Sequence, residues 1–137
     1  MISFFSNKLG YDYPWAKYSQ MVGRDYVSGA MENTTATLHQ ESAYQNAREL
    51  VDGIGWESTI AHELFHHWFG DLVTAESWSN ITVNESFADY SEYLWNEYKY
   101  GKDQADYHIL KSLDGYKNNP ANFSKDLVRF SYNSRED

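Results

Sequence analysis

Apolar residues recur at helical spacing in the middle of the chain, between residues 56 and 69. They are Ile60, Ala61, Leu64, Phe65 and Trp68. Such spacing places apolar side chains on one side of a helix, and the glycine that follows, Gly70, is a typical C-terminal stop. The pattern predicts a helix over residues 56–69.

Three further segments have helical patterns. Residues 2–9 are rich in apolar positions and end before Gly10, which predicts a short first helix. A second pattern runs from about Val83 to Lys99, with Gly101 behind it, and a third begins near Asp103. The third helix would have its apolar positions along one face, at Ile109, Leu110 and Leu113.

Two segments rich in Tyr, Val and Thr, residues 18–27 and 34–39, predict β-strands. They flank residues 29–33, which we expect at the edge of a small sheet. Residues 40–55 are polar and contain glycines, so we expect a loop there, with a helical turn near residues 47–51.

Composition and charge narrow the class of protein. The 137 residues are 42% hydrophobic and 23% charged, which fits one folded domain. Twenty acidic and 11 basic residues give a net charge of −9, which argues against nonspecific binding to nucleic acid or to anionic membranes. There is no signal-peptide pattern and no membrane-spanning run, so we expect a soluble protein, cytoplasmic or exported. Because cysteine is absent, a metal would be held by histidines and carboxylates.

The central helix carries two histidines four residues apart, His62 and His66, with Glu63 between them. Residues four apart differ by about 40° around a helix, so both imidazoles point the same way and can bind one zinc ion. Glu63, about 100° from His62, would reach a metal-bound water instead. The alternative is a pair of histidines with ordinary core hydrogen bonds. His67, about 140° from His62, should point away from the metal.

A catalytic zinc ion needs a third protein ligand and one open position for water. Glu85 is a candidate because it follows His66 by 19 residues, at the start of the next predicted helix. It could instead close a capping box with Thr82. Asp89 and Glu92 lie one and nearly two turns further on, where they could accept hydrogen bonds from the ligating imidazoles or be solvated acidic residues.

The sequences HELFHHWFGDLVT and WSNITVNESFA, at residues 62–74 and 78–88, resemble the aminopeptidase N family of zinc metallopeptidases. That family carries HExxH, an 18-residue spacer and a glutamate, as between His66 and Glu85 here. Its second signature, GAMEN, lies upstream and corresponds to residues 29–33. The resemblance covers roughly residues 1–115. It implies a thermolysin-like gluzincin core in which GAMEN lies at a small sheet edge.

The resemblance also implies a role for each residue of the site. His62, His66 and Glu85 would hold one zinc ion per chain, and Glu63 would be the general base. Glu32 would bind the free amine of a peptide substrate. The other substrate-binding residues would be Ser28, which lines the pocket for the first residue, Gly29 and Ala30, which present main-chain groups, and Met31 and Asn33.

The resulting prediction is a predominantly helical α+β fold that is part of a metallopeptidase catalytic domain. Residues 1–55 would supply the sheet edge and the substrate-binding part, and residues 56–117 the zinc-binding helices. Residues 118–137 would be a polar tail that leads to a missing segment.

The chain departs from the family in ways that bear on activity. The family's oxyanion-stabilising tyrosine would fall beyond Asp137, and Tyr132 comes too early, so we expect a fragment of a larger aminopeptidase that is inactive without its other domains. Phe65, His67 and Ser86 replace the usual Ala, Gln and Gly. A thermolysin-like endopeptidase, which would not need Glu32, and a noncatalytic, zinc-stabilised interaction module are the alternatives.

Overall fold

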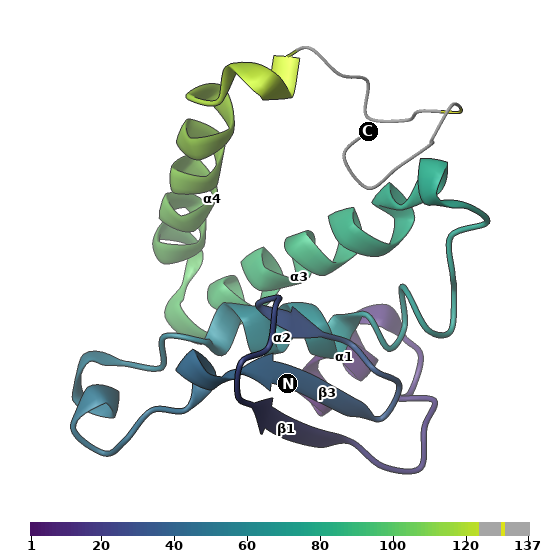
Figure 1. The fold of residues 1–137 in the computed structure, drawn as a ribbon, viewed down its shortest axis with the longest axis horizontal. Coiled ribbons are helices and arrows are strands. Elements are labelled where there is room, and N and C mark those ends of the chain that lie inside the picture. Colours follow the sequence, from purple (N-terminus) through teal and green to yellow (C-terminus); the bar gives the residue numbers. More distant parts are fainter. Residues whose placement is uncertain (124–129, 131–137) are drawn as a thin grey trace.

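The computed structural model describes residues 1–123 and residue 130, and it has an α+β fold (Figure 1). Its helices are α1 (Ile2–Leu9), α2 (Glu57–Phe65), α3 (Thr82–Tyr100) and α4 (Lys102–Lys117), and its strands are β1 (Ser19–Gly23), β2 (Ala30–Met31) and β3 (Ala36–Gln40). Short 3₁₀ turns lie at Glu41–Ala43, Glu49–Asp52, Trp78–Asn80 and Pro120–Phe123. All four predicted helices are present in the described residues, as is a helical turn close to the predicted residues 47–51.

The helix α2 is shorter than its apolar pattern predicts, because it tightens before it ends. The backbone N–H groups of His67 and Trp68 donate to carbonyls three residues back, those of Leu64 and Phe65, at 3.2 and 3.0 Å. This spacing is typical of a 3₁₀ turn at the end of an α-helix. The prediction of a helix over residues 56–69 was therefore wrong at its C-terminal end.

The core forms where α2 packs against α1. Its buried members are Phe5, Ala61, Leu64, Phe65 and Trp68. The rings of Phe5 and Phe65 meet edge to face, with centroids 5.0 Å apart. Aromatic pairs of this kind add to the hydrophobic stabilisation of a core. Four of the five apolar positions that predicted the central helix are buried here. The apolar pattern therefore predicted correctly which side of this helix faces the core.

The small sheet has the order β1–β3–β2, with β3 parallel to β1 and antiparallel to β2. Both predicted strands are present but shorter, and the chain turns at Asp25 and Thr35, where φ is 53° and 68°. Thr37 and His39 on β3 are buried. Because β2 is an outer strand, residues 30–31 lie at a sheet edge.

The helix α3 passes alongside α2, and α4 then extends away from the rest of the fold (Figure 1). The apolar positions predicted along one face of α4 are largely exposed: Ile109 is 43%, Leu110 57% and Leu113 41% accessible. No helix among the described residues is long and apolar enough to cross a membrane. The predicted polar tail lies mostly outside the described residues, as does Tyr132.

A buried carboxylate, that of Glu57, ties the start of α2 to the end of α3. It accepts hydrogen bonds from the indole of Trp95 at 2.9 Å, from the ammonium of Lys99 at 2.5 Å and from the hydroxyl of Tyr100. Burial alone would raise the pKa of Glu57, but these hydrogen bonds outweigh it and lower the pKa. The link fixes how α3 lies against α2.

Replacement of Glu57 by Ala is expected to lower the free energy of unfolding by about 2–3 kcal/mol, because three donors lose a shared acceptor. Urea denaturation at neutral pH measures this loss. Lys102→Ala, which removes the exposed Lys102–Asp106 ion pair, is the control and should change stability little. Equal denaturation midpoints for the two variants would contradict a structural role for Glu57.

Candidate metal centre and substrate cleft

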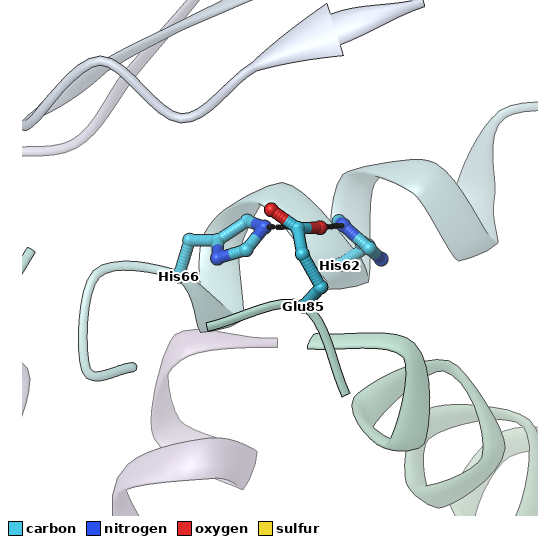
Figure 2. A group of neighbouring side chains, drawn as sticks. All are labelled: His62, His66 and Glu85. Atoms are coloured by element: carbon cyan, nitrogen blue, oxygen red, sulfur yellow. Dashed lines mark hydrogen bonds and ion pairs between the residues drawn. The ribbon is translucent and has the colours of Figure 1, made fainter. Parts of the chain in front are cut away.

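Three candidate ligand atoms converge on one point, from His62 on α2, His66 directly after it and Glu85 on α3 (Figure 2). The Nε2 atoms of His62 and His66 are 3.1 Å apart, and Oε2 of Glu85 lies 3.5 and 3.6 Å from them. A tetrahedral zinc ion with bonds of about 2.0–2.2 Å separates its ligand atoms by about 3.3–3.6 Å. The three side chains therefore fit a zinc ion with little adjustment.

Each imidazole is oriented by a hydrogen bond at its other nitrogen. Nδ1 of His62 lies 3.2 Å from carboxylate oxygens of both Asp89 and Glu92. Nδ1 of His66 lies 3.0 Å from the backbone oxygen of Phe69. Because these partners accept hydrogen bonds, they favour a proton on Nδ1, which leaves Nε2 with a lone pair for a metal. The structure thus brings Asp89 and Glu92 to the positions expected of partners for a ligating histidine.

The carboxylate of Glu85 is directed at the histidines and not at the backbone of its own helix. α3 begins at Thr82 with no side-chain cap hydrogen bond. The alternative in which Glu85 closes a capping box with Thr82 is therefore not adopted.

The charges around the histidines favour a cation. Burial lowers the pKa of His62, but hydrogen bonds to Asp89, Glu85 and Glu92 outweigh it and raise the pKa to about 12. Hydrogen bonds to His62 and His66 lower the pKa of Glu85 to about 2. The carboxylates that stabilise a positive charge on these imidazoles would also stabilise a divalent cation held between the side chains.

Glu63 lies beside His66 and is largely shielded from solvent. Its side chain is buried, its Oε2 has no hydrogen-bond partner among the described residues, and burial is the main reason that its pKa rises to about 7. One ligand atom each of Glu63, Glu32 and His66 lie within 4.8 Å of one another. A carboxylate whose pKa is near neutrality can accept and return a proton at physiological pH.

These side chains open onto a cleft of about 600 Å³. The predicted residues that line it are Ser28, Gly29, Ala30, Met31, Glu32, His62, Glu63, His66, Glu85 and Glu92. Asn33 and Asp89 are not among its lining residues. The backbone oxygen of Asn33 instead accepts a hydrogen bond from Ala36 at 2.7 Å and closes a turn.

Five further lining residues were not predicted: Trp56, Thr59, Trp78, Ile81 and Asn84. Helical spacing could have identified Trp56 and Thr59, because positions 56, 59, 63 and 66 follow one another at intervals of three and four. Trp78 and Ile81 lie in the connection that leads to α3, where no periodic pattern marks them, and Asn84 lies in the first turn of α3.

Two glycines near the cleft differ in what the fold requires of them. At Gly29 a Cβ atom would lie 3.9 Å from Trp56, an ordinary contact, so the fold does not require glycine there. At Gly70 φ is 147°, and a Cβ atom would lie 2.9 Å from the backbone oxygen of His66 and 3.1 Å from its Nδ1. Glycine at 70 lets the chain turn back directly against a candidate metal ligand.

His67 points away from the metal ligands, as predicted. Its ring is fully buried, with centroids 5.6 Å from Tyr13 and 5.2 Å from Tyr18. It belongs to none of the groups of side chains in the described residues that could hold a metal.

Two imidazoles four residues apart, a glutamate between them and a second carboxylate nearby are the side chains of a metallopeptidase. The sequence model of the Peptidase family M1 domain matches residues 1–134, so the chain belongs to peptidase family M1.

Similar proteins include aminopeptidases from bacteria and mammals. The chain is 43% identical to aminopeptidase N of Streptomyces lividans over 93 residues, 65% of this chain and 10% of the relative. It is 39% identical to aminopeptidase N of Oryctolagus cuniculus over 102 residues, 72% of the chain and 10% of the relative. Its identity with endoplasmic reticulum aminopeptidase 1 of Homo sapiens is 37% over 97 residues, 69% of the chain and 10% of the relative. The chain thus spans about a tenth of the length of these relatives.

Gly70→Ala is expected to weaken zinc binding by residues 1–137, because the added methyl group would displace His66. Strain of about 1–3 kcal/mol that falls on a ligand corresponds to a roughly ten- to hundredfold weaker affinity. Competition with a coloured chelator measures it. Gly115→Ala, at a helical position in α4 with nothing within 4 Å, is the matched control and should bind zinc as the wild type does. Equal affinities for the two variants would show that Gly70 does not support His66.

Proposed function

We propose that residues 1–137 contain the zinc centre of an aminopeptidase that removes residues from the N-terminus of peptides. The observation that carries this proposal is the convergence of His62, His66 and Glu85, with Glu63 and Glu32 in the same cleft. We assign one zinc ion per chain to the first three residues. When bound, zinc supplies a water of lowered pKa, about 7, and polarises the substrate carbonyl.

Glu63 is the general base in this proposal. Its carboxylate takes a proton from the attacking water and delivers it to the leaving amine. The unpaired Oε2 and the raised pKa of Glu63 support this role, because a base of this kind must be free to accept a proton near neutral pH.

Glu32 determines which peptide bond is cut. It is the first residue after β2, and its carboxylate lies within 4.8 Å of ligand atoms of Glu63 and His66. A carboxylate at that place can bind the ammonium group of a peptide and put the first peptide bond beside the base. An endopeptidase would have no use for this contact, so the position of Glu32 favours an aminopeptidase.

The remaining assignments follow the same scheme. Ser28, Met31 and the main-chain groups of Gly29 and Ala30 contact the substrate, and Asn33 shapes the turn behind Glu32. We also propose that α2, α3 and the sheet edge form part of a thermolysin-like core. We assign hydrolysis to a polypeptide of the relatives' length, and expect residues 1–137 alone to bind zinc without appreciable turnover.

Residues 1–137 are expected to bind about one zinc ion, and to bind it more weakly as the pH falls. Both imidazoles must be neutral to bind zinc, and the pKa values of His62 and His66 are raised in the metal-free chain. Binding therefore releases protons, and the affinity increases as pH rises. Titration calorimetry between about pH 6 and pH 8, in buffers of different ionisation enthalpy, measures both effects.

The double variant His62→Ala/His66→Ala should lose the zinc ion. A stoichiometric ion in that variant, or an affinity that does not change with pH, would exclude histidine ligation.

In a polypeptide of the relatives' length, Glu63→Gln is expected to keep its zinc and lose about 10²–10⁴-fold in turnover, because an amide cannot accept the proton. Assays on amino-acid anilides, together with metal analysis, measure both quantities. Glu76→Gln, at an exposed position, is the control for loss of one negative charge. Wild-type turnover by the Glu63 variant would remove this residue from the mechanism.

A further inference from the structure

The ring of His67 joins two parts of the chain that lie 32 positions apart. Its Nε2 accepts a hydrogen bond from the backbone N–H of Thr35 at 2.9 Å, and its Nδ1 donates to the backbone oxygen of Glu63 at 3.2 Å. Because an amide N–H only donates and a carbonyl only accepts, these partners require a neutral imidazole with its proton on Nδ1. The ring is fully buried, so neither partner can be replaced by bulk water.

The tightened end of α2 makes the carbonyl of Glu63 available for this contact. In a continuing α-helix, that carbonyl would accept from the backbone N–H of His67. Here the N–H of His67 donates instead to Leu64 at 3.2 Å. The ring of His67 then donates to the carbonyl of Glu63, to which the backbone N–H of His67 does not donate.

The other end of the link is the loop between β2 and β3, which begins with Glu32 and ends with Thr35. Thr35 has φ of 68°, an uncommon value for a β-branched residue. Its N–H is held by His67, and its carbonyl accepts from Ser19 at 2.9 Å. A strained residue persists only where its surroundings fix it, so the ring of His67 helps to determine the shape of this loop.

We propose that His67 is a positioning residue, which holds the loop that carries Glu32 at a fixed place relative to Glu63. The inference rests on the proposed function, in which Glu32 binds the substrate amine. His67 does not line the cleft, so it would act through the loop and not on the substrate. The metal ligands take their orientation from Asp89, Glu92 and Phe69 instead. Loss of the link should therefore weaken amine binding and spare zinc binding.

The test compares two ligands on zinc-loaded residues 1–137. Leucine hydroxamate has a free α-amine and a zinc-binding group, and N-acetyl-leucine hydroxamate lacks the charged amine. The ratio of their dissociation constants measures the amine contact separately from the metal contact. A charge-assisted contact predicts a preference of about ten- to hundredfold for the free amine in the wild type, and its loss in Glu32→Gln.

His67→Leu places an apolar side chain of moderate size in the buried site and removes both hydrogen bonds. We expect its amine preference to fall about tenfold, while its zinc affinity and its affinity for the acetylated ligand stay within about threefold of the wild type. His67→Gln should restore the preference, because a side-chain amide offers both an N–H donor and a carbonyl acceptor. Trp15→Phe removes a bond to the backbone oxygen of His67, not to its ring, and should leave the preference unchanged.

The possible results distinguish the positioning role of His67 from the amine-binding role of Glu32. A wild-type chain that binds both ligands equally would overturn the amine-binding role of Glu32, and the role of His67 with it. A wild-type preference that is kept in His67→Leu would overturn only the positioning role. If His67→Leu loses affinity for zinc and for both ligands together, His67 only stabilises the fold. The same conclusion follows if His67→Gln does not restore the amine preference.

Discussion

The candidate metal centre depends on a hydrogen bond at the Nδ1 atom of each imidazole. A helical spacing of four places His62 and His66 on one side of α2, but it does not turn their rings. Asp89 and Glu92 of α3 set the ring of His62, and the backbone oxygen of Phe69 sets that of His66. Only with both rings fixed in this way do the two Nε2 atoms meet Glu85 at one point.

This requirement explains features of the fold that lie away from the ligands. The carbonyl of Phe69 can reach back to His66 only because α2 stops at Phe65 and the chain turns at once. Gly70 permits that turn, since any larger residue would contact His66. The carboxylates of α3 reach His62 only if α3 keeps its place along α2, which the buried carboxylate of Glu57 helps to fix. The way α2 ends and the way α3 packs against it thus both support the candidate metal centre.

The sequence predicted those parts of the site that depend on local spacing. The four helices and the shared direction of His62 and His66 follow from periodicity, which is a property of neighbouring residues. The assignment of Glu85 needed the family resemblance, because a spacing of 19 residues fixes no distance until α3 packs on α2. The early end of α2 was missed, since the apolar pattern continues through Trp68 while the backbone has already tightened. Trp78 and Ile81 reach the cleft through an irregular connection, for which sequence patterns give no signal.

Local sequence patterns also could not predict the pairing of β3 with both of its neighbours, which places the strand that precedes Glu32. β3 lies between β1 and β2 and carries the short outer strand that precedes Glu32. Packing of the sheet against α2 brings this strand towards the metal centre, but packing alone is tolerant of small displacements. A directional contact is needed to place one carboxylate within a few ångströms of another.

Two consecutive residues at the end of α2, His66 and His67, point in different directions. His66 faces the cleft with Glu85, and His67, about 100° further around the helix axis, faces the loop at Thr35. The same turn therefore presents a candidate metal ligand on one side and, in our proposal, holds the loop that carries Glu32 on the other.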